Sequence, residues 1–368
     1  MPLSVSAAAS TTQQLGRHVM KKILVVGGGL TSAVTASLLS PHAASSQPLS
    51  VTVWDKARGA GGRMSTSRSP GNPDCTLDLG AQYITVNPTY AVEHKSDYEA
   101  LVAAGLLAPL QAQVLGMKPM DEAQNHYVAP RGCSSLVKHY LAQAKCEVGF
   151  GHHVSEVTRH QAQWTVKTQN GVSDQFDVVV LTMPLPQVLA LGGSIQDTLK
   201  EQHNGLSQLL QDVQYSARYA LGYFYDEPVD LKLDFDAQYI QDDPVLRFVS
   251  VDNRKRGLGP DSPTSLVFHT SVSFGLEHVE STPQALQAQL VACVRARFPD
   301  LPEPKHVKCQ KWRYSQVSRP LTGMPGFAIL ERQPLLIVGG DGLTHSNFDG
   351  CLKSAKAVAA QVLASFKE

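Results

Sequence analysis

The sequence predicts an α/β protein with a parallel, Rossmann-like sheet and a smaller second domain of mixed α+β structure. Three observations support this fold. Residues 21–32, KKILVVGGGLTS, form a β-branched run that ends in glycines before a helical stretch. A second run, residues 50–54, ends on Asp55. Near the other end, residues 334–342, PLLIVGGDG, have the pattern of a buried strand followed by a glycine-rich turn.

Composition excludes several classes of protein. The 368 residues include 32 Lys+Arg and 32 Asp+Glu, so the formal net charge is zero, and 43% are hydrophobic. This balance excludes a disordered chain and argues against nucleic acid or an anionic membrane surface as a partner. The six cysteines form no CxxC pair and no apolar run reaches 18 residues, so we predict no metal site, no disulfide framework and no membrane span.

Residues 1–19 are rich in Ser, Thr, Ala and Gln, and we predict a disordered N-terminal extension. The first apolar run, residues 23–26, already belongs to the first strand, so a secretory signal is not expected. We therefore favour a cytoplasmic location. Secretion is the alternative, and the acid-free extension adds a mitochondrial option.

The first glycine-rich segment has the spacing of a dinucleotide fingerprint, with Ser32 in place of its third glycine. Gly27 would make the turn, and Gly29 would let the backbone approach a pyrophosphate at a helix N-terminus. Asp55 follows 26 residues after Gly29, where a carboxylate can accept hydrogen bonds from an adenosine ribose. The alternatives are a plain glycine-rich turn and an aspartate that only caps a turn.

Two further motifs narrow the class of cofactor. Residues 61–63 read Gly-Gly-Arg, which places the bidentate phosphate donor Arg63 on a backbone that can approach closely. DLGAQYI follows at residues 78–84, and a Gly-Gly-Asp turn at residues 339–341 precedes a C-terminal helical stretch. Together these motifs resemble the flavin-dependent amine oxidase superfamily.

Longer segments are similar to the renalase family within that superfamily: VWDKARGAGGRM at 53–64, CQKWRYSQV at 309–317 and GGDGLTHSNFDGC at 339–351. The resemblance implies non-covalently bound FAD in a domain of the p-hydroxybenzoate hydroxylase type. It places the adenosine diphosphate at Gly27, Gly29 and Asp55, and the adenine near Val154. It places the ribityl chain at Asp341, and further FAD contacts at Thr31, Arg63, Gln82 and Tyr83.

The same resemblance, with the turn signals, predicts interleaved domains. Residues 20–86, 128–186 and 305–368 would form the FAD-binding domain. Residues 87–127 and 187–304 would form the substrate domain.

No nucleophile motif is present, which suits an enzyme whose flavin performs the redox chemistry. The resemblance implies oxidation of isomeric dihydronicotinamides, NAD(P)H reduced at ring carbon 2 or 6, to NAD(P)⁺, with O₂ reduced to hydrogen peroxide. The pocket candidates are mostly flat aromatic side chains that could stack on a nicotinamide: Tyr223, Tyr225, His269, Trp312 and Asn347. The alternative for each aromatic is an ordinary core position. The helix that begins near residues 349–350 could direct its positive end at the flavin pyrimidine.

Two other functions stay open. The first is oxidation of amines such as catecholamines, although Phe348 stands where amine oxidases place a tyrosine. The second is a secreted signalling protein that binds a cell-surface receptor and uses the flavoprotein fold as a scaffold.

Overall fold

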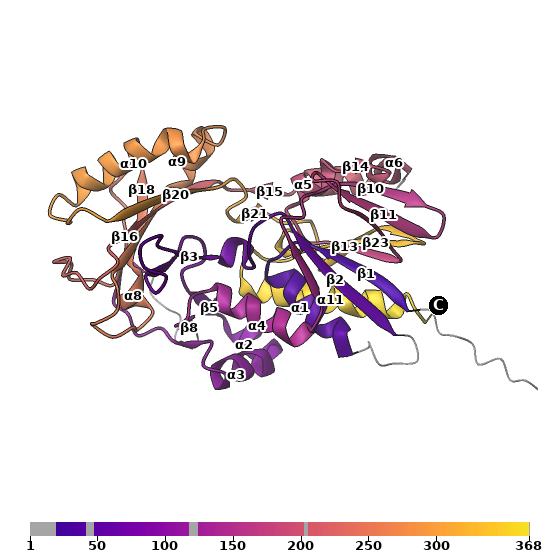
Figure 1. Cartoon of the computed structure of the whole chain (residues 1–368), viewed down its shortest axis with the longest axis horizontal. Coiled ribbons are helices and arrows are strands. Elements are labelled where there is room, and N and C mark those ends of the chain that lie inside the picture. The colour runs from indigo at the N-terminus through magenta and orange to yellow at the C-terminus, as the bar shows by residue number, and fades with distance from the viewer. Residues whose placement is uncertain (1–19, 42–47, 118–123, 202–204, 368) are drawn as a thin grey trace, which may run out of the picture.

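The chain folds into two domains whose sheets lie at opposite ends of the long axis (Figure 1). The computed structural model describes residues 20–41, 48–117, 124–201 and 205–367. The predicted disordered extension, residues 1–19, lies outside the described residues. Segments from both ends of the described chain meet in the first domain, as the indigo and yellow elements show.

The first domain is built on a six-stranded sheet of order β22-β23-β13-β1-β2-β9. All neighbouring strands run parallel except β22 and β23. In sheet order the strands span Phe327–Arg332, Leu335–Gly339, Val178–Leu181, Lys21–Val26, Leu49–Asp55 and Glu147–Phe150. Both faces of this sheet are covered, and the central strand β13 and its neighbour β23 are accordingly buried along their whole length.

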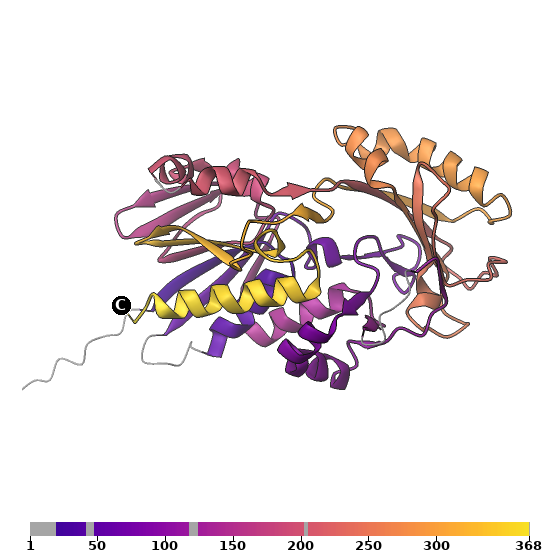
Figure 2. The ribbon, with the colours of Figure 1, turned by 180° about the vertical axis from the view of Figure 1, so that it is seen from behind.

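Alternate residues of each strand enter two separate cores. Ile23 and Val25 face a helical layer, whereas Leu24 and Val26 face the opposite layer. The helical layer contains α1 (Leu30–Leu39), α2 (Pro88–Glu93), α3 (Lys95–Ala103), α4 (Ser134–Ala144) and α11 (Phe348–Ala364). Figure 2 shows α11 running along this side of the sheet.

The opposite layer is a β-meander with three short helices packed beside it. It contains β10 (Val154–His160), β11 (Gln163–Thr168), β12 (Ser173–Phe176) and β14 (Gly192–Gly193), with α5 (Leu185–Leu189), α6 (Ile195–Glu201) and α7 (Leu206–Gln211).

The second domain is a six-stranded sheet of order β20-β16-β19-β18-β17-β7. In that order the strands span His306–Trp312, Arg218–Phe224, Ser265–Thr270, Leu246–Val251, Ala237–Tyr239 and Val114–Leu115. The outer face packs against α9 (Val272–Glu277) and α10 (Pro283–Arg297), and α8 (Asp252–Lys255) follows β18 directly.

The inner face of this sheet receives an arm of the first domain, the hairpin of β3 (Thr66–Arg68) and β4 (Thr76–Asp78). Leu77 and Leu79 pack there against β16. A Cβ atom added to Gly222 would lie 3.0 Å from a methyl group of each leucine, so the glycine admits this close approach.

Short connecting elements complete the fold: β5 (Ile84–Val86), β6 (Ala108–Pro109) and β8 (Asn125–Val128) in one small sheet, β15 (Gln214–Tyr215) and β21 (Val317–Arg319) in another, and the 3₁₀ turns η2 (Gly62–Met64) and η3 (Asp341–Leu343).

The structure shifts three predicted domain boundaries. Strand β20 pairs with β16, so residues 306–312 lie in the second sheet and not in the first domain. Helices α2 and α3 pack into the core of the first domain, although residues 87–127 were assigned to the second. Helices α6 and α7, also assigned to the second domain, likewise pack beside the meander. Each shift depends on a long-range contact that the local sequence pattern does not specify.

All six cysteines lie in described segments, and each is a free thiol. Among the described residues, no helix combines the length and the apolar character that crossing a membrane requires. The cytoplasmic location stays a prediction.

Trp164 joins the meander to the first sheet, and replacing it tests this packing. Its fully buried indole Nε1–H donates to the carbonyls of Pro334 and Leu335, both at 3.1 Å. We expect Trp164→Ala to lower the free energy of unfolding by about 4 kcal/mol, through cavity formation and loss of the indole hydrogen bond. Chemical denaturation checks this, with the exposed Phe150→Ala as the control. Equal losses in the two variants would contradict the packing role.

Candidate functional site

The turn between β1 and α1 leaves a helix N-terminus open. Gly27 has φ 122°, and a Cβ added there would lie 2.3 Å from Thr182 Oγ1. Gly29 begins α1 without a side-chain cap, and the first turn contains no acidic residue. A Cβ on Gly29 would meet no atom within 4 Å. The open space beside Gly29, at a helix start without a side-chain cap, fits a pyrophosphate.

Asp55 lies at the end of β2, beside this turn. Its Oδ2 accepts a hydrogen bond from the Gly28 N–H, and its Oδ1 accepts one from the Ala57 N–H at 2.6 Å. Each oxygen keeps a lone pair that can accept from a ribose hydroxyl. Val154, the first residue of β10, is buried in the same cluster as Trp54. Asp55 directly follows Trp54, so the two residues predicted for the adenosine end, Asp55 and Val154, lie at the same hydrophobic cluster.

Arg63 and Asp341 form a bidentate ion pair between η2 and η3. Nη1 lies 2.6 Å from Oδ2 and Nη2 lies 2.6 Å from Oδ1. Burial alone would lower the pKa of the Arg63 guanidinium, but the Asp341 carboxylate more than offsets this and raises it. The fork that we expected to bind phosphate is therefore occupied by a carboxylate. Arg63 instead joins the two turns that were predicted to contact the cofactor.

Thr31 lies close to these turns. It is the second residue of α1 and is buried, and its Cγ2 would lie 3.9 Å from a Cβ added to Gly339 at the end of β23. The Gly61 N–H donates to the Gly28 carbonyl at 2.8 Å, so the Gly-Gly-Arg turn contacts the fingerprint turn. These predicted FAD contacts converge where β1, β2 and β23 end.

The segment 78–83 continues the site toward the second domain. The Ala81 N–H donates to the Arg63 carbonyl at 3.0 Å, and a Cβ on Gly80 would lie 2.0 Å from that oxygen. The Leu79 carbonyl accepts from His269 Nε2 and from Trp312 Nε1, each at 2.9 Å. Two predicted pocket residues therefore meet at the segment that holds Gln82 and Tyr83.

An aromatic row crosses the inner face of the second sheet. His269 is paired with Phe248, and Phe248 with Tyr239, so the three side chains share one face. The Tyr239 hydroxyl forms a hydrogen bond with the Tyr83 hydroxyl of the first domain. Sequence reasoning missed Tyr239, because only strand register places it in one row with Phe248 and His269.

His269 is a neutral hydrogen-bond donor in this row. Burial lowers the pKa of His269 to about 4, despite its hydrogen bond to the Leu79 carbonyl. Because a carbonyl oxygen only accepts, Nε2 carries the proton and Nδ1 is left as an acceptor.

The pocket prediction is wrong for Tyr223 and Tyr225. His269 pairs with Ala220, so even-numbered positions of β16 face the site and odd-numbered ones face α10. Both tyrosines are buried in that outer core, and the Tyr225 hydroxyl donates to the Pro302 carbonyl at 3.0 Å. They are core aromatics, as the alternative interpretation held.

Asn347 caps the C-terminal helix. Its side-chain oxygen accepts from the Gly350 N–H at 2.7 Å. The neighbouring Ser346 hydroxyl donates to Asp341 Oδ2 at 3.0 Å, so this helix start is tied to the Arg63–Asp341 pair. In the first turn, the buried Asp349 carboxylate accepts from His94 Nδ1 at 2.8 Å.

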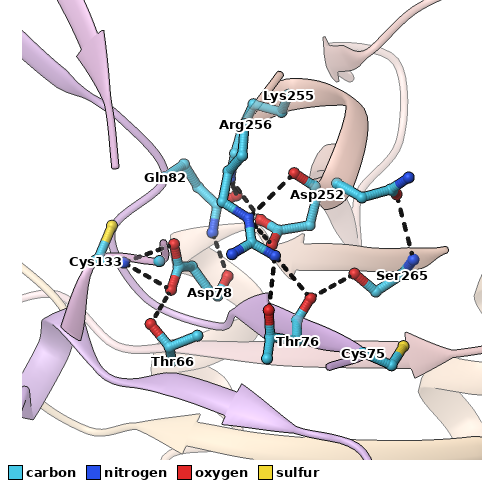
Figure 3. Close-up of polar contacts among 12 residues, drawn as sticks. Thr66, Cys75, Thr76, Asp78, Gln82, Cys133, Asp252, Lys255, Arg256 and Ser265 are labelled. Carbon is cyan, nitrogen blue, oxygen red and sulfur yellow. Dashed lines mark hydrogen bonds and ion pairs between the residues drawn. The ribbon is translucent and has the colours of Figure 1, made fainter. Parts of the chain in front are cut away.

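A buried polar network joins the two domains behind Gln82 (Figure 3). Lys255 Nζ donates to Gln82 Oε1 at 2.8 Å and to Asp252 Oδ1 at 2.7 Å. Arg256 Nε lies 2.9 Å from Asp252 Oδ2. Burial alone would raise the pKa of Asp252, but Arg256 and Lys255 lower it below its ordinary value. The charged run at residues 252–256 gave no sign of this burial in the sequence.

Asp78, in the same network, has its pKa shifted in the opposite direction from that of Asp252. Burial and the nearby Asp252 carboxylate raise the pKa of Asp78 above its ordinary value. Its side chain accepts from the Thr66 hydroxyl at 2.6 Å and from the Cys133 N–H.

Known proteins resemble this chain in sequence and in fold. A family model described as flavin containing amine oxidoreductase matches residues 100–363, and an NAD(P)-binding Rossmann-like domain matches residues 25–98. The chain is 42% identical to renalase of Mus musculus over 340 residues, which cover 92% of this chain and 98% of the mouse protein.

Two solved structures share the fold at low identity. A putative protoporphyrinogen oxidase from Exiguobacterium sp. 255-15 gives a TM-score of 0.70 at 13% identity, covering 95% of this chain and 99% of that chain. A wild-type putrescine oxidase bound to putrescine gives 0.65 at 12% identity, covering 94% and 99%.

The fold and the family models define a flavin-dependent oxidoreductase that binds FAD, and they confirm the predicted Rossmann-like fold and cofactor. The open N-terminus of α1 and the free lone pairs of Asp55 fit that cofactor. Within this class, the chain belongs to the renalase family. The predicted FAD contacts stay predictions residue by residue.

Arg63 and Asp341 can be tested by removing the guanidinium. Because Arg63→Ala leaves the nearly buried Asp341 carboxylate without its positively charged partner, we expect a loss of about 3 kcal/mol in stability and weaker FAD retention. Thermal unfolding and the flavin-to-protein absorbance ratio measure the two effects. The control is Arg159→Ala, which removes an exposed pair with Glu331 and should cost under about 1 kcal/mol. Wild-type FAD content in Arg63→Ala would contradict the assignment.

The lowered pKa of His269 predicts a pH dependence. Between pH 6.5 and about 4, the unfolded chain binds a proton that folded His269 does not, so this residue contributes stability that is lost as pH falls through that window. We expect the loss to be smaller in His269→Asn. NMR of labelled histidine should show that this imidazole does not titrate between pH 8 and pH 5. A midpoint near the ordinary value of about 6.5 would refute the assignment.

Proposed function

We propose that this enzyme oxidises isomeric dihydronicotinamides, 1,2-dihydro- and 1,6-dihydro-NAD(P), to NAD(P)⁺. Bound FAD would accept a hydride from ring carbon 2 or 6, and the two electrons, with two protons, would then reduce O₂ to hydrogen peroxide. The overall change consumes one solvent proton. The substrate is a dinucleotide, and O₂ is the second reactant.

The convergence of His269 and Trp312 on the Leu79 carbonyl carries this proposal. It fixes one flat indole and one neutral imidazole beside the segment predicted to contact FAD. An indole face suits stacking on a planar nicotinamide ring. His269 Nδ1, left as an acceptor, can receive the N–H of a carboxamide and so orient that ring.

Hydride transfer from a dihydropyridine ring requires the protein to orient that ring and does not require a side chain to remove a proton. Loss of hydride converts the dihydropyridine to an aromatic cation, so no proton has to leave the carbon in the same step. His269, with a pKa of about 4, acts here as an orienting acceptor. Asn347 caps the start of α11, and this helix N-terminus would offer partial positive charge to the flavin pyrimidine.

Amine oxidation receives less support from the packing around α11. Phe348 stands where amine oxidases place an aromatic cage residue, but it is buried in the first core with its ring centroid 5.6 Å from that of Tyr98. That ring faces the helical layer. The fold shared with putrescine oxidase concerns architecture and leaves the substrate open.

Anaerobic mixing separates these functions. We expect the visible absorbance of the oxidised flavin to bleach within one turnover when 1,2- or 1,6-dihydro-NAD(P) is added, with NAD(P)⁺ as product. Putrescine and catecholamines should leave the spectrum unchanged. Readmitted O₂ should restore the absorbance and yield one hydrogen peroxide per NAD(P)⁺. Bleaching by amines alone would overturn the proposal in favour of amine oxidation.

A further inference from the structure

Lys255 carries a fully buried ammonium group, which is an unusual position for a charged side chain. Its side chain has 0% exposure, and it ends the one-turn helix α8 in the second domain. Removing a charged amine from water is costly unless partners replace the lost hydration. Its two partners come from different domains: Asp252 on its own helix, and Gln82 in the segment predicted to contact the flavin.

The contact with Gln82 fixes the orientation of that amide. Gln82 Nε2 donates to the carbonyls of Asp78, at 2.5 Å, and Gly80, at 3.1 Å. An ammonium only donates, so Gln82 Oε1 must face Lys255 and Nε2 must face the two carbonyls. Rotating the amide by 180° would place N–H against an ammonium and oxygen against carbonyls. Both N–H groups of the amide are thus used within the protein.

Neutralising Asp252 does not by itself require Lys255. Arg256 Nε lies 2.9 Å from the second carboxylate oxygen of Asp252, and Arg256 Nη2 donates to the Thr76 carbonyl at 2.9 Å. With Lys255 removed, the carboxylate would keep a buried cation beside it. The contribution that belongs to Lys255 alone is its hydrogen bond across the domain junction to Gln82 (Figure 3).

We propose that Lys255 is a positioning residue that reaches from the second domain and, through the Gln82 amide, holds the turn at residues 80–82 in the shape that receives the flavin. The inference rests on the proposed flavin contact of this segment. It also explains how a residue of the second domain supports cofactor binding in the first.

A double-mutant cycle on FAD binding tests the proposal. Lys255→Met and Gln82→Met should each raise the dissociation constant for FAD roughly tenfold, as expected for one lost hydrogen bond to a charged group. Because Lys255 acts through Gln82, the dissociation constant for FAD should be no higher in the double variant than in either single variant. The long-wavelength absorbance band of the bound flavin should shift in the same way in all three.

Lys232→Met is the matched control, since Lys232 also pairs with an aspartate but is 75% exposed. It should bind FAD like the wild type. Additive losses of roughly a hundredfold in the double variant, or an unchanged dissociation constant in Lys255→Met, would overturn the proposal.

A folding failure of Lys255→Met leaves the test intact. Gln82→Met keeps both cations beside Asp252, and wild-type FAD affinity in that folded variant would refute the inference. These measurements involve no dihydronicotinamide, so their failure is distinct from failure of the proposed oxidation.

Discussion

Four consecutive carbonyl groups, from Asp78 to Ala81, accept hydrogen bonds from side chains, and the candidate site depends on this arrangement. The Gln82 amide donates to the carbonyls of Asp78 and Gly80. His269 and Trp312 both donate to the Leu79 carbonyl. The Cys133 thiol donates to the Ala81 carbonyl. Buried carbonyls need partners, and an irregular segment cannot find all of them in a strand ladder. The donors come from both domains, so the shape of this segment depends on how the second sheet docks.

Docking of the second sheet is in turn an apolar contact. The hairpin of β3 and β4 places Leu77 and Leu79 on β16, where Gly222 leaves room for them. The polar network of Asp252, Lys255 and Arg256 lies beside this contact and adds direction to it. Packing supplies the attraction between the domains, and the buried hydrogen bonds select one relative placement.

Local motifs predicted the strand, turn and helix at the nucleotide end of the candidate site, and the structure contains them. The strand, turn and helix around Gly29 and the carboxylate of Asp55 are features of short, contiguous segments. Arg63 was predicted as a phosphate donor, and its pairing with Asp341 was not predicted, because 278 residues separate the two. With a net charge of zero, attraction for anionic FAD then depends on the α1 N-terminus more than on a free guanidinium.

The substrate side was predicted less well, because it depends on strand register. A shift of one residue exchanges the two faces of a strand, and this separates His269 from Tyr223. Tyr239 and Lys255 enter the site only through pairing and docking across domains, and no local pattern encodes either contact. The boundary near residue 305 failed for the same reason, since β20 finds its partner in β16.

A crystal structure of the protein with bound FAD tests the central claim most directly. The account predicts that the isoalloxazine ring lies against the backbone of residues 80–83, with Trp312 and His269 on the substrate side and the Gln82 amide still bonded to Lys255. A ring seated against another segment, or a Gln82 amide turned away from Lys255 toward the flavin, would contradict it.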